Sequence, residues 1–149
     1  MIFNWVVRYI GFLKHIPLLA MVFDGWLMIW NAISNPEIPA VIDKIEATVE
    51  TWRGIEFTIH KFGGLQLNYQ GCEVGHIHSN GILDISFPKK IRDTLIKNGS
   101  AVRHHIFVRS GWISFYIRTE QDYDAAIALL RLSYEYKRTH LHLKASQQT

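Results

Sequence analysis

Glycine-containing turns divide the centre of this chain into segments that are too short for ordinary helices. Gly63-Gly64, Gly71 and Asn80-Gly81 separate four short runs, at about 55–60, 65–70, 72–78 and 82–87. Short runs bounded by turn signals are typical of strands, and tight connections join antiparallel neighbours. The sequence therefore predicts an antiparallel sheet in this part of the chain.

Two helices are predicted on either side of these strands. Asn35-Pro36 and Pro39 mark the start of the first, whose apolar residues lie on one face: Ile38, Val41, Ile42, Ile45, Val49 and Trp52. The second helix opens at Pro88 and closes at Gly99. Each helix has one apolar side, so both are expected to pack on the sheet.

A final helix is predicted at about 121–138. It starts from Thr119, with Asp122 in capping-box spacing, and is expected to bury Ala125, Ile127, Leu129, Leu130 and Leu132. Together these elements predict an α+β domain over residues 34–138, an antiparallel sheet with helices packed on one face, followed by a tail over 139–149. The order of the strands in the sheet is left open.

Residues 1–33 are more hydrophobic than the rest of the chain. Their spacing predicts a pair of helices, and they contain three formal charges: Arg8, Lys14 and Asp24. Asp24 lies near the middle of the second helix, where its insertion cost roughly cancels the gain from the apolar residues. Pro17, Gly25 and Asn31 then argue against a membrane span. Three interpretations stay open: a helical hairpin packed on the domain, an interfacial membrane anchor, or a dimer element.

Secretion is not expected, because no small-residue cleavage site follows the apolar run of residues 16–23. We expect a cytoplasmic protein, with membrane association as the alternative. The single cysteine, Cys72, excludes an intrachain disulfide framework. The net charge is only +3, yet residues 88–118 alone carry +6, so any anionic partner is expected there.

The register of the first hairpin decides which polar residues share a face. A three-residue Ser79-Asn80-Gly81 loop pairs Ile77 with Leu83 and His76 with Asp84, which keeps one face apolar. The other face then carries four polar side chains: His76, His78, Asp84 and Ser86. A carboxylate across from an imidazole fixes its orientation and favours its charged form, which suits a proton-transfer pair or a metal site.

A second hairpin is predicted from strands at about 102–108 and 112–117 with a turn at Ser110-Gly111. This register places His104 on the apolar side, as a core residue. The outward side pairs Arg103 with Arg118, His105 with Tyr116, and Arg109 with Trp112. Guanidinium groups beside aromatic rings bind anions, stacked bases or planar ligands, so His105 is the better functional candidate of the two adjacent histidines.

Several motifs between Trp52 and Tyr136 resemble one family. They are Trp52-Arg53-Gly54, His60-Lys61-Phe62-Gly63-Gly64, Gly75-His76-Ile77-His78, Asp84, Phe87-Pro88, Arg92-Asp93, His104-His105, Ser110-Gly111-Trp112-Ile113-Ser114-Phe115 and Leu130-Arg131-Leu132-Ser133-Tyr134. In this order they resemble the "luciferase domain" family of bacteria and fungi, whose function is unknown. The family name does not establish light emission. The resemblance implies that some fungal members carry a hydrophobic N-terminal anchor, which keeps the membrane interpretation of residues 1–33 open beside the other two.

A weaker similarity runs from Ala101 through Trp112 to Ser133-Tyr134. It is to the double-wing family of small proteins resembling MmcQ and YjbR, and it implies a compact α+β sheet and a role in DNA binding. The usual Tyr-His element of that family is replaced here by His104-His105.

The sequence favours a binding domain for a small or anionic ligand on an open sheet face. The candidate binding residues are His76, His78, Asp84, Arg103, His105, Trp112, Tyr116 and Arg118. One alternative is a metal-dependent enzyme that uses His76 and His78 with Asp84, His60 or His105. The other is a nucleic-acid-binding or membrane-associated interaction module, with residues 1–33 contacting a membrane surface or forming a homodimer.

Overall fold

The computed structural model describes residues 22, 25–26, 36–61 and 63–146. The predicted helical pair at 1–33 therefore lies almost wholly outside the described residues. Within the described part, no helix combines the length and the apolar character needed to cross a membrane.

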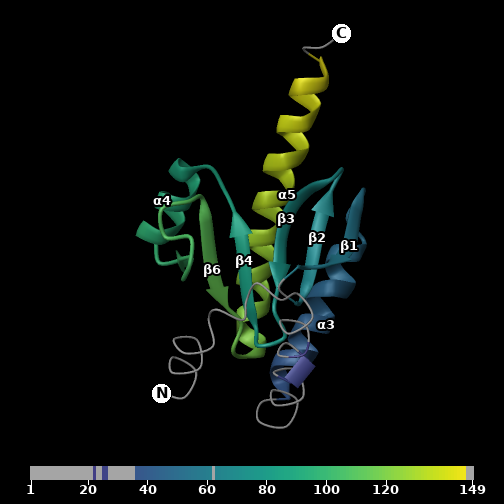
Figure 1. Ribbon diagram of the computed structural model, residues 1–149, viewed down its shortest axis with the longest axis vertical. Coiled ribbons are helices and arrows are strands. Elements are labelled where there is room, and N and C mark those ends of the chain that lie inside the picture. Colours follow the sequence, from purple (N-terminus) through teal and green to yellow (C-terminus); the bar gives the residue numbers. More distant parts are fainter. Residues whose placement is uncertain (1–21, 23–24, 27–35, 62, 147–149) are drawn as a thin grey trace.

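Six strands form one antiparallel sheet (Figure 1). The order across the sheet is β1-β2-β3-β4-β6-β5, which answers the question that the sequence left open. The strands are β1 (Ile55–Ile59), β2 (Leu65–Tyr69), β3 (Cys72–Ile77), β4 (Ile82–Ser86), β5 (Val102–Arg103) and β6 (Trp112–Tyr116). The first four strands are confirmed where the turn signals predicted them.

The helices are α3 (Glu37–Glu50), α4 (Lys89–Lys97) and α5 (Tyr123–Ser146). Helix α5 packs on β2, β3 and β4, while α3 packs on β1 and α5. Figure 1 shows the C-terminal half of α5 extending past the sheet, so the helix runs through much of the stretch predicted as a tail. The predicted apolar stripe is confirmed: its five residues on α3 are buried, and so is Trp52, which lies just after the end of the helix.

One face of the sheet is apolar and forms the core with α5 and α3. Its fully buried side chains include Leu67, Ile77, Leu83, Ile85 and Ile113. Burying a side chain of this size contributes about 1.5–3 kcal/mol. The sheet therefore takes its stability from this face, and the opposite face is available for polar residues.

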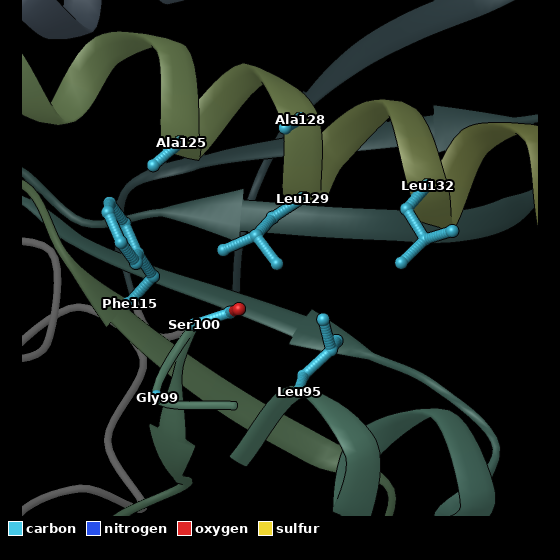
Figure 2. Close-up of a pocket in the computed structure, with 8 residues that line it drawn as sticks. All are labelled: Leu95, Gly99, Ser100, Phe115, Ala125, Ala128, Leu129 and Leu132. Atoms are coloured by element: carbon cyan, nitrogen blue, oxygen red, sulfur yellow. The ribbon is translucent and has the colours of Figure 1, made fainter. Parts of the chain in front are cut away.

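The face that α5 buries differs from the predicted one. Leu129 and Leu130 are buried as expected, but Leu132 is 40% exposed and Ala125 is also exposed. The buried positions recur at steps of three and four: Ala126, Leu129, Leu130, Ser133 and Tyr134. The prediction followed apolar character and missed this spacing, because the stripe includes a serine and a tyrosine. Ala125 and Leu132 instead line a hollow of about 420 Å³ with Leu95 and Phe115 (Figure 2).

The first hairpin has the predicted register. His76 pairs with Asp84 and Ile77 with Leu83. Gly81 adopts a φ of +81°, and a Cβ there would lie 2.4 Å from the carbonyl oxygen of Ile117. Only glycine fits this position, which holds the turn against the end of β6.

The predicted second hairpin is wrong. Only Val102 and Arg103 pair with β6, opposite Ser114 and Ile113, and residues 104–111 form a loop. The imidazole of His104 causes the departure, because its Nδ1 accepts hydrogen bonds from the backbone N–H groups of Ile106 and Phe107, both at 3.0 Å. These bonds turn the chain away from β6, so Arg103 is not opposite Arg118.

Candidate metal centre

The face of the sheet opposite the core carries a row of polar residues. Consecutive cross-strand pairs join Thr58 to Gln66, Gln66 to His76, His76 to Asp84, and Asp84 to Ser114. Directly paired residues point to the same side of a sheet, so this row crosses five strands without an apolar side chain. The sequence predicted an open face, but its centre is closed: Asp84 and Ser114 are fully buried.

Asp84 is the centre of this face. Its Oδ1 accepts a hydrogen bond from the hydroxyl of Ser114. Its Oδ2 faces three imidazole Nε2 atoms, at 3.5 Å for His76, 3.6 Å for His78 and 3.4 Å for His104. No hydrogen bond of normal geometry reaches Oδ2. Burial alone raises the pKa of Asp84, but the neighbouring His104, His76, His78 and Ser114 outweigh it and hold the pKa well below its usual range.

His76 is oriented by a second carboxylate. Its Nδ1 donates to Oε1 of Glu73 at 2.6 Å. Burial lowers the pKa of His76, but the neighbouring carboxylates of Asp84 and Glu73 raise it by more, and the net pKa lies above its ordinary value. A carboxylate on Nδ1 leaves Nε2 as the atom that faces Asp84, which is how histidines are oriented in metal sites.

A β-bulge brings Glu73 to this face. Residues three apart on a regular strand point to opposite sides of the sheet. Here Leu67 pairs with Gly75 while Asn68 pairs with Glu73, so Val74 is an extra residue on β3. The bulge therefore places Glu73 on the same side as His76. The sequence gives no local sign of the bulge, and Glu73 was not among the predicted site residues.

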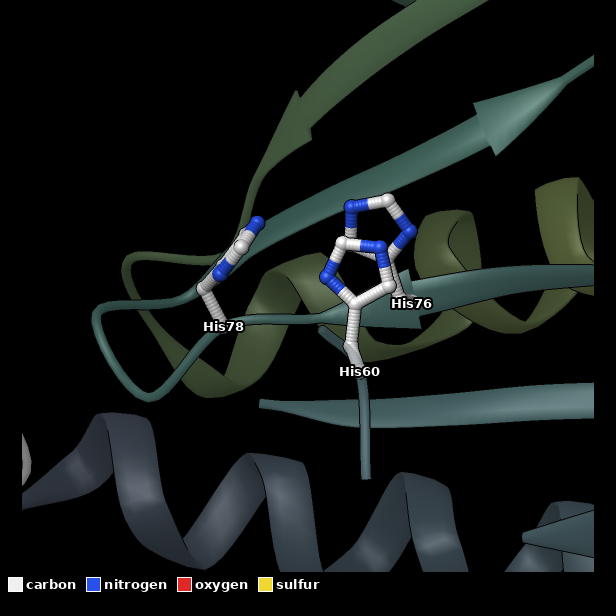
Figure 3. Close-up of side chains that lie close together, drawn as sticks. All are labelled: His60, His76 and His78. Atoms are coloured by element: carbon white, nitrogen blue, oxygen red, sulfur yellow. The ribbon is translucent and has the colours of Figure 1, made fainter. Parts of the chain in front are cut away.

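His60 joins the cluster from the end of β1. Its ring stacks on that of His76 with centroids 3.8 Å apart, and candidate ligand atoms of His60, His76 and His78 all lie within 4.8 Å of one another. Figure 3 shows the three rings gathered at one place. Burial and the neighbouring His76 lower the pKa of His60 to about 4, so its imidazole is neutral at pH 7.

The turn after β1 explains why His60 reaches this position. Gly64 has a φ of +84°, and a Cβ there would lie 2.3 Å from the carbonyl oxygen of Ile77. The backbone of this turn therefore lies directly against the end of β3, where a side chain would not fit. The backbone N–H of His60 donates to the carbonyl of Gly64, which closes the turn.

His104 has a different role from the other histidines. It is buried, as predicted, and it lies beside Asp84, with its ring against Phe107 and Trp112. Its Nδ1 accepts two backbone hydrogen bonds and so carries no proton. The proton of the neutral ring is therefore on Nε2, which faces Oδ2 of Asp84. His104 therefore presents a proton, and not a lone pair, toward the carboxylate.

His105 is exposed and stacks on His104 with ring centroids 4.5 Å apart. Asp84, His104 and His105 form a second group whose candidate ligand atoms lie within 4.8 Å of one another. Both nitrogens of His104 are occupied, because Nδ1 accepts backbone hydrogen bonds and Nε2 carries a proton. His104 therefore cannot bind a metal ion in this arrangement, and the second group is left with Asp84 and His105 as ligands. His60, His76 and His78 form the better ligand set, and two of them, His76 and His78, also face Asp84.

The remaining predicted residues are divided between the cluster and its surroundings. Trp112 lies against the cluster, with its ring centroid 5.3 Å from that of His76. Tyr116 is 38% exposed further along β6, and the guanidinium of Arg118 lies over its ring at 5.6 Å. Arg103 is exposed on β5. The structure therefore gathers the histidines, Asp84 and Trp112, and leaves the arginines outside this cluster.

Comparison with known proteins gives one match. No curated protein and no solved structure matches the chain. A family match covers residues 71–133, a stretch that contains most of the cluster, including Glu73, His76, His78, Asp84 and His104, while His60 precedes it. The family is described as Luciferase domain, so the predicted resemblance is confirmed over this stretch.

Proposed function

We propose that this domain binds one divalent transition-metal ion through His60, His76, His78 and Asp84. One observation carries the proposal: the Nε2 atoms of His76 and His78 lie 3.5 and 3.6 Å from a buried carboxylate oxygen without a hydrogen bond of normal geometry. Two ligands that each lie about 2.0–2.2 Å from a common tetrahedral ion are about 3.3–3.6 Å apart. The observed spacing suits ligands of one ion better than hydrogen-bonded partners.

The donor set limits which ions fit. Imidazole nitrogens with a single carboxylate suit zinc, iron, cobalt, nickel or copper, whereas magnesium and calcium prefer oxygen ligands. A bound ion of this kind would act as a Lewis acid or as a redox centre. Three groups outside the ligand set surround it: Glu73 orients His76, Ser114 donates to Oδ1 of Asp84, and the protonated Nε2 of His104 lies 3.4 Å from Oδ2.

The test is titration of the untagged full chain with Zn²⁺ and Co²⁺. We expect one equivalent to bind, and His78→Ala to weaken binding at least about tenfold, as loss of one ligand does. His78 is the safest ligand to replace, because its side chain is 19% exposed. His140→Ala is the matched control, because its exposed imidazole lies on α5 and bonds only locally to Tyr136. Equal binding by wild type and His78→Ala would contradict the proposal.

A second candidate function is binding of a small anion beside Arg118. It is supported by a hollow of about 190 Å³ that Ser100, Val102, Tyr116 and Arg118 line in part. If this hollow binds an anion such as inorganic phosphate, Arg118→Ala will lose salt-sensitive phosphate binding and keep metal binding. Phosphate binding that is unchanged in Arg118→Ala would reject this candidate without affecting the metal proposal.

A further inference from the structure

The loop between β5 and β6 presents three consecutive large apolar side chains to solvent. Ile106 is 54% exposed, and Phe107 and Val108 are each 50% exposed. Single exposed apolar residues are common on protein surfaces, but a run of three at a loop tip is not, and such a patch marks a surface that is covered by a partner.

Hydrogen bonds hold this tip in place. His104 accepts from the N–H groups of Ile106 and Phe107, and the N–H of Ser110 donates to the carbonyl of Phe107 at 3.0 Å. The guanidinium of Arg92 on α4 donates to the carbonyl of Ser110. The loop is therefore tied to the sheet face at one end and to α4 at the other, and its exposed side chains are a fixed feature of the fold.

Positive charge surrounds the tip. Arg103 and Arg109 flank it and are exposed, and residues 103–111 contain no acidic side chain. Lys89 and Lys90 are exposed at the start of α4, the helix that Arg92 ties to this loop. An apolar tip that is flanked by two arginines and tied to a helix with two exposed lysines is complementary to a bilayer interface, where acyl chains lie beneath anionic headgroups.

We propose that the Ile106–Val108 tip docks on an anionic lipid surface. The three apolar side chains enter the boundary between headgroups and acyl chains, and Arg103, Arg109 and the two lysines contact the headgroups. Aliphatic stems of arginine and lysine can lie along apolar surface while their charged ends reach the phosphates. This contact lies within the folded domain, uses none of the proposed metal ligands and does not depend on a bound metal.

A label at the tip tests the proposal directly. In a Cys72→Ser background, Val108→Cys carries a polarity-sensitive fluorophore, and Ile59→Cys carries it in the control, because Ile59 is 72% exposed on β1, at the opposite edge of the sheet from β5. With vesicles of phosphatidylcholine and phosphatidylserine, the label at 108 should shift to the blue and become shielded from iodide, and the label at 59 should not. A label at 108 that stays accessible to iodide would overturn the proposal, and so would equal shielding at both sites.

The role of charge in docking is tested by changing the lipid composition and by one substitution at Arg109. Shielding at 108 should require phosphatidylserine, and Arg109→Glu in the Val108→Cys background should raise the lipid concentration needed for half-maximal shielding about fivefold or more at physiological salt. Arg109 is exposed at the loop, so the fold should be unaffected. Equal shielding on pure phosphatidylcholine, or an unchanged half-maximal concentration, would reject an anionic surface as the partner.

Discussion

A buried carboxylate is costly unless its neighbours replace the water that it loses. Asp84 is compensated by a serine hydroxyl on one oxygen and by three imidazoles around the other. The pairing of His76 with Asp84 could be predicted, because the apolar alternation of two strands fixes their register. Glu73 could not be predicted, because a bulge inside β3 reverses the side on which it points.

Ser114→Ala tests how much Asp84 depends on its neighbours. The substitution leaves a buried carboxylate oxygen without its hydroxyl donor, so we expect the metal-free protein to lose about 1–3 kcal/mol of unfolding free energy. Urea denaturation measures the change. Thr94→Ala removes an exposed hydroxyl that bonds to the backbone of α4, and it should change stability by no more than about 0.5 kcal/mol. Similar losses in both variants would be inconsistent with a special role for Ser114.

Metal binding should release protons. Burial lowers the pKa of His76, but the neighbouring carboxylates of Asp84 and Glu73 raise it by more, so the metal-free imidazole holds its proton to a higher pH than a free histidine does. A metal ligand must give up this proton, and affinity should therefore fall as pH falls through the pKa of His76. Calorimetric titration in buffers of different ionisation enthalpy counts the released protons. Binding heats that are independent of the buffer would show that no proton leaves.

At the scale of elements, the predictions of helices and strands failed where side chains form hydrogen bonds with the backbone. The first four strands and α3 follow from turn residues and apolar spacing, and the structure confirms them. The second hairpin fails, because the acceptor nitrogen of His104 captures two N–H groups that a strand would have given to β6. The buried face of helix α5 was predicted only in part, because its buried stripe includes Ser133 and Tyr134, whose hydroxyls bond to the carbonyls of Val74 and Arg53.

Substitutions at two glycines allow the stability cost of a left-handed backbone to be measured apart from the cost of a steric clash. Gly71 and Gly81 have φ values of +76° and +81°, but only at Gly81 would a Cβ meet another atom, 2.4 Å away. Gly71→Ala should cost about 1–2 kcal/mol for the left-handed conformation alone. Gly81→Ala should cost more than that and also weaken metal binding, because it displaces the hairpin that carries His78. Thermal or urea unfolding compares the two, and a smaller cost at Gly81 would argue against this packing.

At the scale of the whole molecule, the strand order assembles the cluster. His60 stacks on His76 and His104 lies beside Asp84, and these two distant parts of the sequence meet in one cluster only because β1 to β4 run side by side and β6 adds next to β4. The spacing of residues that are close in the sequence predicts neither the strand order nor the turn in which the backbone of Gly64 lies against β3. His60 was therefore only one of several candidates for a third ligand, and its place beside His76 became clear from the assembled sheet.

The central claim is that His76, His78 and Asp84 share one metal ion, with His60 as the third imidazole. Crystals of the untagged full chain grown with Zn²⁺, measured on both sides of the zinc absorption edge, test it most directly. We predict one strong anomalous peak at about 2.0–2.2 Å from Nε2 of His76, Nε2 of His78 and Oδ2 of Asp84. An empty cluster, with zinc bound only at surface positions such as His140, would contradict the claim.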